Sequence, residues 1–185
     1  MSFKRLSRPG KLQQVMIGVL ESVIPERGAA YVAGPLDSGL EFFRRIATGD
    51  TRHKELREYN ERRMREVVDK LRSQSNIPVI DPGLLRVPGW SAQEYGIFFL
   101  TVIERFVREI WFMDGWEYSY GATKEFIVSS ERCVHLLNER GEELSRGDAQ
   151  RLIEGAVDDL TRLGISPTRF ESRLRMLARS KDSHY

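Results

Sequence analysis

The chain has 185 residues, of which 41% are hydrophobic and 30% charged, so it is long enough to bury a core and too apolar to be disordered. Its 29 basic and 27 acidic side chains nearly cancel, and composition therefore gives no strong signal for nucleic-acid binding. The single cysteine, Cys133, excludes an internal disulfide, and charges interrupt every apolar stretch before it reaches membrane-spanning length. We therefore expect a cytoplasmic protein that does not contact a membrane.

The first element expected along the chain is a helix. Four basic side chains open the chain and are typical of a solvated terminus, and apolar residues then recur at helical spacing from about residue 12 to 23. Pro25 to Gly28 ends this run. The short apolar segment Ala29–Ala33 predicts a buried strand, which leads into a loop that starts at Gly34-Pro35.

The remaining elements alternate in the same way. Strands are expected at residues 76–80, 109–113 and 132–137, and helices at 52–73, 89–107, 120–130, 147–163 and 167–179. Short apolar strands separated by long helices predict an open parallel sheet of four or five strands, flavodoxin-like or Rossmann-like, with helical crossovers. The strand at 132–137 makes Cys133 a packed, inert thiol.

The chain divides into three expected parts. Residues 1–28 are expected to form a basic tail and a helix, and residues 29–140 the α/β domain. Residues 141–185 are expected to form a helical extension packed on the same domain, although residues 165–185 are also compatible with a separate arm used in oligomerisation.

Three junctions between a strand and the following segment are candidate ligand sites. Ligands of an open α/β sheet bind beyond the carboxyl ends of its strands, and parallel strands place all these ends on one edge. The rule selects the loop from Gly34 to Gly39, the turn that starts at Asp81, and the segment from Asp114 to Glu125. The three histidines, at positions 53, 135 and 184, have no metal-ligand spacing, and we expect no metal.

The third junction carries the most chemistry. Asp114-Gly115 makes a turn after the strand, and Gly121 permits close approach of a ligand near the start of a helix. Ser119 offers a hydroxyl, and the first N–H groups of a helix can hold an anion such as phosphate. Glu125 lies about one turn into this helix, where its side chain can point back toward the crevice.

Aromatic side chains of the same junction offer flat faces for a nucleobase. Trp116 and Tyr118 have aromatic rings on which a base can stack. Each of these residues also has a purely structural interpretation. Ser119 can be a helix cap, Glu125 a partner of the helix dipole, and Trp116 part of the core.

Taken together, two segments resemble a known superfamily. The strand with Tyr31-Val-Ala-Gly-Pro35, and the later motif Gly115-Trp-Glu-Tyr-Ser-Tyr-Gly-Ala-Thr-Lys-Glu125, are similar to the nucleoside 2-deoxyribosyltransferase-like superfamily. The nearest branch comprises small proteins with an Ala-Gly-Pro start and a Gly-Trp-Glu-x-Ser-x-Gly-Ala-x-x-Glu motif. The resemblance covers roughly residues 31 to 130, and it implies the same α/β fold.

The resemblance implies cleavage of the N-glycosidic bond of a nucleoside or a nucleoside 5′-monophosphate. Glu125 matches the nucleophile, which attacks the anomeric carbon and holds the sugar as an ester until water or a second base releases it. Ser119 matches a position that is serine in the nucleotide hydrolases and aspartate in the base-exchanging transferases. Tyr31 is expected to orient the glutamate. This chemistry requires no cofactor.

The same resemblance suggests the substrate contacts. The loop is expected to approach the sugar or phosphate, and the expected substrate-binding residues are Gly34, Pro35, Asp37, Ser38, Asp81, Asp114, Gly115, Trp116 and Gly121. The sequence departs from the family at Arg108, where many relatives carry aspartate, and in a first loop without the arginine that hydrolases use for phosphate. Lys124 and Arg44 are either replacements for that arginine or exposed charges.

Two other functions remain open from the sequence. One is a non-catalytic module that binds or senses a nucleotide, and the other is a structural assembly protein on the same fold. Relatives complete their pocket with a neighbouring subunit, which implies a homodimer or a larger homo-oligomer. The aromatic residues at 90, 95, 98 and 99 are either part of such an interface or part of the core.

Overall fold

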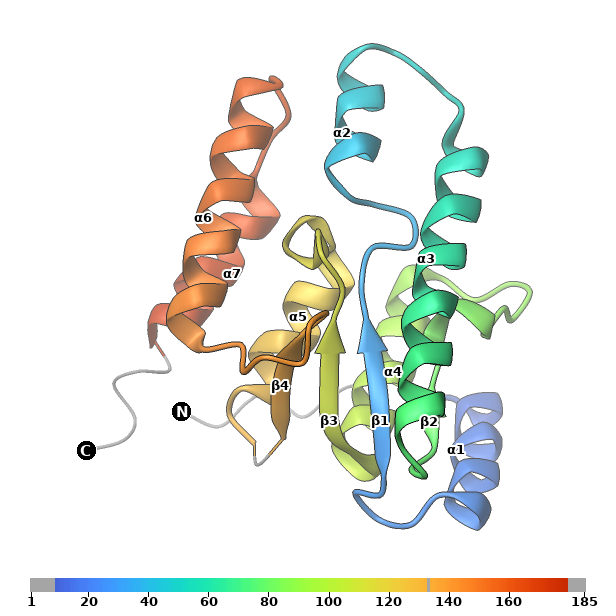
Figure 1. Cartoon of the computed structure of the whole chain (residues 1–185). Helices are drawn as coiled ribbons and strands as arrows, with labels where there is room; N and C mark the ends of the chain where they lie inside the picture. The colour runs from blue at the N-terminus through green and yellow to red at the C-terminus, as the bar shows by residue number, and fades with distance from the viewer. Residues whose placement is uncertain (1–8, 133, 180–185) are drawn as a thin grey trace.

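The computed structural model describes residues 9–132 and 134–179 (Figure 1). Cys133, the basic residues before Pro9, and His184 lie outside these ranges, so the interpretations that concern them are not tested. The elements in chain order are α1 (Lys11–Val23), β1 (Ala29–Ala33), α2 (Leu40–Ala47), α3 (His53–Gln74), β2 (Val79–Ile80), the short 3-10 helix η1 (Pro82–Leu84), α4 (Ala92–Phe106), β3 (Val107–Phe112), the 3-10 helix η2 (Trp116–Tyr118), α5 (Tyr120–Ser129), β4 (His135–Asn138), α6 (Arg146–Arg162) and α7 (Thr168–Arg179).

The strands form one open parallel sheet, as the sequence predicts. It has four strands in the order β2-β1-β3-β4, and every neighbouring pair is parallel. All five residues of β1 are buried, because helices cover both faces of this central strand. The α/β class and the parallel topology are therefore confirmed.

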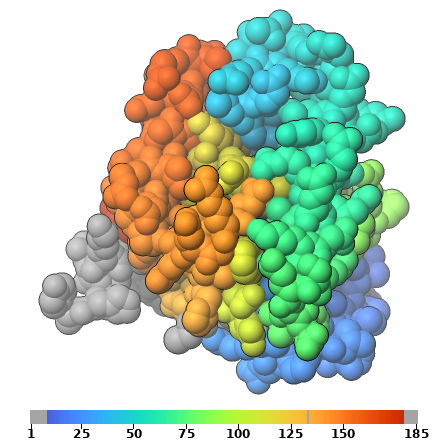
Figure 2. Space-filling model, viewed as in Figure 1, coloured from blue at the N-terminus to red at the C-terminus, as the bar shows by residue number. Residues whose placement is uncertain are grey.

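Helices form a layer on each face of the sheet. α3 lies on the face toward the viewer in Figure 1, and α4 and α5 lie behind. Successive side chains of a strand point to opposite faces. Ala30 and Val32 accordingly pack against α3, while Tyr31 and Ala33 pack on the side of α4 and α5. Figure 2 shows the same view, with α3 in green, the C-terminal helices in orange, and residues near 110–120 in yellow between them.

Some element boundaries differ from the expectation. Helix α2 was not expected, because its eight residues contain too few turns to establish a helical period. β2 has only two residues, since Pro78 lacks an N–H to extend the ladder, although its carbonyl still accepts from the Ala30 N–H at 2.9 Å. β3 starts two residues before the expected Glu109, at Val107.

The C-terminal helices belong to the main core. Phe170 of α7 and Ile153 and Leu160 of α6 are fully buried, and they share one hydrophobic cluster with Phe112 of β3. The described part of α7 is therefore packed against the domain, and the interpretation of a separate arm is wrong for it. Of the helices that the structure describes, none combines the length and the apolar character that crossing a membrane requires.

Candidate functional site

The candidate site lies where the strand order reverses. After β1 the chain moves to β2 on one side, and it then crosses back to β3 on the other side of β1. In an open α/β sheet this switch point, at the carboxyl ends of the strands, is where ligands bind. The first and third predicted junctions follow β1 and β3, so they flank the switch point directly.

These junctions touch each other. A Cβ added to Gly34 would lie 2.8 Å from Sδ and 3.1 Å from Cβ of Met113, so only glycine allows the ends of β1 and β3 to approach this closely. Gly115 has a φ of 87°, and a Cβ there would lie 4.0 Å from Cγ of Pro35. The Gly-Pro loop and the turn after β3 therefore form one continuous surface.

The second junction joins them. A Cβ on Gly83 would lie 3.6 Å from Cδ2 of Leu36, in the first loop. The Asp81 carboxylate accepts from the Gly83 N–H at 2.8 Å and shapes the short η1 turn. The three junctions selected from the sequence thus lie together at one edge of the sheet.

A tyrosine–glutamate pair joins β1 to α5, the helix that starts at this edge. The Tyr31 hydroxyl, from β1, donates a hydrogen bond to Oε1 of Glu125, from α5, at 3.0 Å. Tyr31 is only 1% exposed, and Glu125 is partly buried. The two residues are 94 positions apart in the chain, so the fold itself creates this contact.

The environment changes the acidity of both partners. Burial raises the pKa of Glu125 to about 7, although the Tyr31 hydrogen bond and the positive charge of Lys124 act in the opposite direction. Burial and the neighbouring Glu125 carboxylate raise the pKa of Tyr31 well above its ordinary value, so Tyr31 stays protonated as a donor. A carboxyl that titrates near neutral pH beside a fixed donor is typical of a reactive site.

A second carboxyl group lies near Tyr31. The charge of Asp81 contributes to the raised pKa of Tyr31, and burial raises the pKa of Asp81 itself. Its position after β2 places it on the opposite side of Tyr31's strand from β3. The site therefore combines two carboxyl groups around one buried phenol.

Aromatic side chains of α4 cover the same tyrosine. Phe99 packs edge-on against Tyr31, with ring centroids 6.0 Å apart, and Tyr95 stacks on Phe99 at 6.3 Å. Both are partly exposed, and the Tyr95 hydroxyl is held by the backbone of Val87. Trp90 packs against Tyr95 and Phe98, so these aromatic residues form a cluster within the chain.

Ser119 is the N-cap of α5. Its Oγ accepts from the Ala122 N–H at 3.3 Å, and its side chain is nearly buried. Ser119 therefore caps the helix, which is the structural role that the sequence allows for it. The cap uses the oxygen as an acceptor and leaves the hydroxyl hydrogen as a donor.

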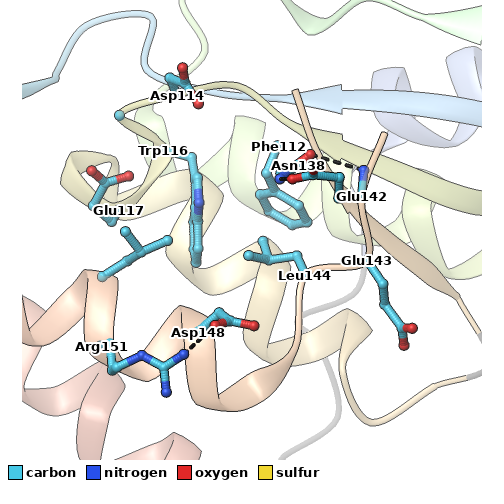
Figure 3. Close-up of a pocket in the computed structure, with 12 residues that line it drawn as sticks. Phe112, Asp114, Trp116, Glu117, Asn138, Glu142, Glu143, Leu144, Asp148 and Arg151 are labelled. Carbon is cyan, nitrogen blue, oxygen red and sulfur yellow. Dashed lines mark hydrogen bonds and ion pairs between the residues drawn. The ribbon is translucent and has the colours of Figure 1, made fainter. Parts of the chain in front are cut away.

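Trp116 lies in the core rather than on an open face. It is 3% exposed, and its ring packs between Phe112 and Phe126, with centroids 4.9 Å and 5.1 Å away. It lines a cavity of about 600 Å³ whose twelve lining residues include five acidic side chains and one arginine (Figure 3). Glu125 is not among the residues that line this cavity.

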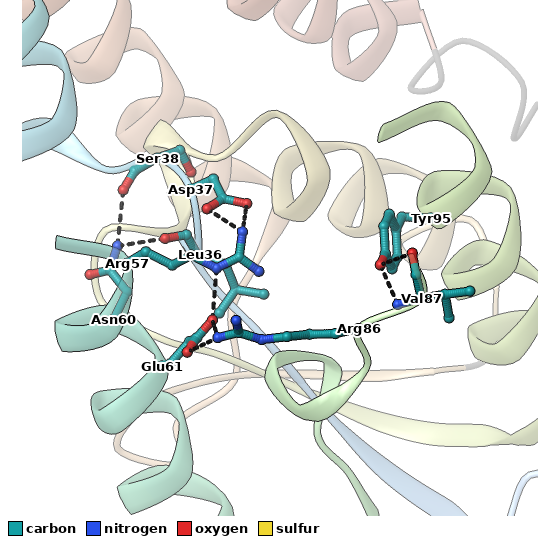
Figure 4. Close-up of polar contacts among 9 residues, drawn as sticks. All are labelled: Leu36, Asp37, Ser38, Arg57, Asn60, Glu61, Arg86, Val87 and Tyr95. Carbon is teal, nitrogen blue, oxygen red and sulfur yellow. Dashed lines mark hydrogen bonds and ion pairs between the residues drawn. The ribbon is translucent and has the colours of Figure 1, made fainter. Parts of the chain in front are cut away.

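Two predicted loop residues, Asp37 and Ser38, have contacts with α3. Both Asp37 carboxylate oxygens accept from Nη1 of Arg57 on α3 at 2.6 Å, and the Ser38 carbonyl accepts from Nδ2 of Asn60 at 3.2 Å (Figure 4). Asn60 also donates to the Leu36 carbonyl at 3.1 Å. These contacts hold the Gly-Pro loop against α3.

Asn60 is not among the site residues predicted from the sequence. The signal is visible, because Asn60 is a single polar residue within the apolar stripe of the predicted helix, at helical spacing from Leu56 and Met64. A buried amide in such a stripe needs hydrogen-bond partners, and here they are loop carbonyls.

Two of the predicted site residues, Asp114 and Gly121, are exposed. Asp114 is exposed and borders the cavity of Figure 3, while its backbone N–H donates to Oε2 of Glu139 at 2.7 Å. Gly121 is exposed on α5, and a Cβ there would meet only Ser119 Oγ, at 3.8 Å. Among the residues that the structure describes, no group of histidine, cysteine, aspartate and glutamate side chains could hold a metal ion.

Comparisons with family models, with curated proteins and with solved structures find no match to this chain. The superfamily resemblance therefore stays a prediction that rests on the quoted motifs.

Proposed function

We propose that this protein cleaves the N-glycosidic bond of a nucleoside or a nucleoside 5′-monophosphate, with Glu125 as the nucleophile. The observation that carries the proposal is the hydrogen bond between Tyr31 and Glu125 at the switch point of the sheet. A carboxyl group with a pKa of about 7 is substantially ionised at neutral pH and can attack.

The proposed reaction has two steps. An ionised Glu125 oxygen attacks the anomeric carbon, the carbon–nitrogen bond breaks, and the base leaves with the electron pair and takes a proton. The sugar stays on Glu125 as an ester. Water, or the nitrogen of a second base, then attacks the same carbon, gives its proton to the group that protonated the leaving base, and releases Glu125 as a carboxylate.

Two other residues have proposed roles in these steps. Tyr31 positions the attacking oxygen through its hydrogen bond. Asp81 is our candidate for the proton donor to the leaving base, because burial raises its pKa and its charge acts on Tyr31. Phe99 and Tyr95, rather than Trp116, are the proposed faces for the base, because they lie beside Tyr31 and are partly exposed.

A non-catalytic nucleotide-binding or sensing module is the second candidate. Arg108, at the position where relatives carry aspartate, is exposed and pairs with its neighbour Glu109 at 3.5 Å. The oxygen of Ser119 is engaged as a helix cap. Both observations are compatible with a pocket that binds without turnover.

A homo-oligomer or an assembly role is the third proposal. Leu12, Val15, Val19 and Val23 form a stripe along α1, and each is at least 51% exposed. An exposed apolar stripe of this kind is typical of a contact surface. It does not involve the Tyr31–Glu125 pair, so it is compatible with either of the other functions.

The test is release of free base from a panel of nucleosides and 5′-monophosphates. Wild type is expected to release base from at least one of them, and Glu125→Ala is expected to lose several orders of magnitude in rate. Glu131→Gln, at an exposed position just beyond α5, is the matched control and should stay active. Binding of a nucleotide without base release by either protein would favour the sensing module.

A further inference from the structure

Helix α5 presents a narrow open strip next to Glu125. Gly121 is its one exposed residue, and Lys124 and Glu125, on either side of the strip, are partly buried. At about 100° per residue, Lys124 lies about 60° to one side of Gly121 and Glu125 about 40° to the other. A ligand above Gly121 would therefore meet a carboxylate on one side and an ammonium group on the other.

The C-terminal helix adds two more cations on the Lys124 side. α7 packs directly against α5. The Arg169 guanidinium lies over the ring of Tyr120, the first residue of α5, at 4.9 Å. Arg173, one turn further along α7, is partly buried.

These three cations have no acidic partner in the described ranges 9–132 and 134–179. No carboxylate of the described residues lies within 4.0 Å of the side-chain nitrogens of Lys124, Arg169 or Arg173. Other basic side chains, such as Arg57 and Arg132, form salt bridges with nearby carboxylates. Nε of Arg173 is buried without a hydrogen-bond partner, and its Nη1 contacts only the Met176 sulfur at 3.7 Å. A buried guanidinium nitrogen without an acceptor is unfavourable, and an anion bound to the partly buried Arg173 would relieve this.

Electrostatics connect the cluster to the proposed nucleophile. Burial and the charge of Arg173 lower the pKa of Lys124, and burial and the charge of Arg169 lower that of Arg173. The Lys124 charge in turn acts on Glu125. The positive charges are thus close enough to repel one another, and they adjoin the site.

We propose that Lys124, Arg169 and Arg173 form a subsite for a phosphate monoester, which makes the substrate a 5′-phosphorylated nucleoside rather than a free one. This inference rests on the proposed function. With the sugar at Glu125, the base extends toward Tyr95 and Phe99 on α4, and the 5′-phosphate extends toward α7. Guanidinium groups match phosphate oxygens with paired N–H donors, and these cations replace an arginine that the first loop lacks.

The first experiment measures binding without catalysis. Deoxyribose 5-phosphate and deoxyribose are titrated into wild type, Arg173→Gln, Lys124→Gln and Arg175→Gln, with calorimetry as the readout and circular dichroism to verify folding. Arg175 is the matched control, because it lies on α7 but is exposed. We expect wild type to prefer the phosphorylated sugar, Arg173→Gln and Lys124→Gln to weaken that binding at least tenfold, and Arg175→Gln to leave it unchanged.

The outcomes separate this inference from the function on which it rests. Equal binding of the sugar phosphate by wild type, Arg173→Gln and Lys124→Gln would overturn the subsite, even if base release from free nucleosides succeeds. Binding that depends on Arg173, with no base release from any nucleoside or 5′-monophosphate, would support the subsite and contradict the glycosidase. If both proposals hold, Arg173→Gln raises KM for a 5′-monophosphate at least tenfold and leaves KM for the matching nucleoside unchanged.

Discussion

The Glu125 carboxyl group loses hydration because it is buried beside β1, and it gains a hydrogen bond from Tyr31 in return. Burial is the larger effect, and it leaves the pKa near 7. The resemblance to the superfamily implies that Tyr31 orients Glu125, and the structure brings the two side chains into contact. It could not predict the acidity, because that depends on how completely α4, α5 and β1 exclude water from the carboxylate.

The first prediction at the residue scale concerns the pH dependence of base release. Attack requires an ionised Glu125, so kcat/KM should rise with pH through a midpoint near 7. Tyr31→Phe removes the hydrogen bond that lowers this pKa, so the midpoint should move to higher pH and activity at pH 7 should fall about tenfold. A midpoint that stays in place in Tyr31→Phe would show that Tyr31 does not act on Glu125.

The second prediction concerns stability. The folded protein holds a proton on Glu125 that the unfolded chain releases near pH 4.5, so this group costs stability as the pH rises from about 4.5 to about 7. Glu125→Gln lacks that cost. Relative to wild type, the variant should gain about 1 to 3 kcal/mol between pH 4.5 and pH 8. Urea unfolding at both pH values measures the difference, and an equal difference at both would contradict a raised pKa.

At the scale of elements, the first loop depends on a partner far away in the sequence. Asn60 of α3 holds two carbonyls of this loop, and the loop's Gly34 lies against Met113 of β3. The long helices and β1 are predictable from their periodicity and composition. α2 and the ends of β2 and β3 are not, because short elements take their limits from neighbours rather than from an internal pattern.

Asn60→Ala tests how the loop is held. It removes the donor from two carbonyls near the site, and it should cost about 1 to 3 kcal/mol of stability while increasing hydrogen exchange in residues 34–39. Asp37→Asn is the control, because the exposed pair with Arg57 should contribute less than about 1 kcal/mol. If both variants lose similar stability and show similar hydrogen exchange, the surface ion pair holds the loop as strongly as Asn60 does.

Gly34→Ala tests the contact between the first and third junctions. The added methyl group would overlap Met113, so we expect a loss of about 1 to 3 kcal/mol in urea unfolding. The control is Gly155→Ala in α6, where a Cβ meets nothing within 4 Å and should stabilise the helix by about 0.5 to 1 kcal/mol. An unchanged stability in Gly34→Ala would mean that the two junctions separate easily.

At the scale of the whole molecule, the fold brings three separate parts of the sequence to one edge. The superfamily resemblance ends near residue 130, yet α7 lies against α5 and places Arg169 and Arg173 beside the candidate site. This contact was not predictable, because helix–helix packing between distant segments leaves no periodic signal in either segment. The parallel sheet was predictable, because alternation of short strands and long helices allows few other folds.

In the proposed reaction, Glu125 carries the sugar as a covalent ester. The most direct measurement is acid quenching of wild type during turnover of a 5′-monophosphate, followed by mass spectrometry of the intact protein and its peptides. We expect a mass increase equal to one sugar phosphate less one water, located on the peptide that contains Glu125 and absent from Glu125→Gln. Base release that continues in Glu125→Gln, or an adduct located on another residue, would contradict it.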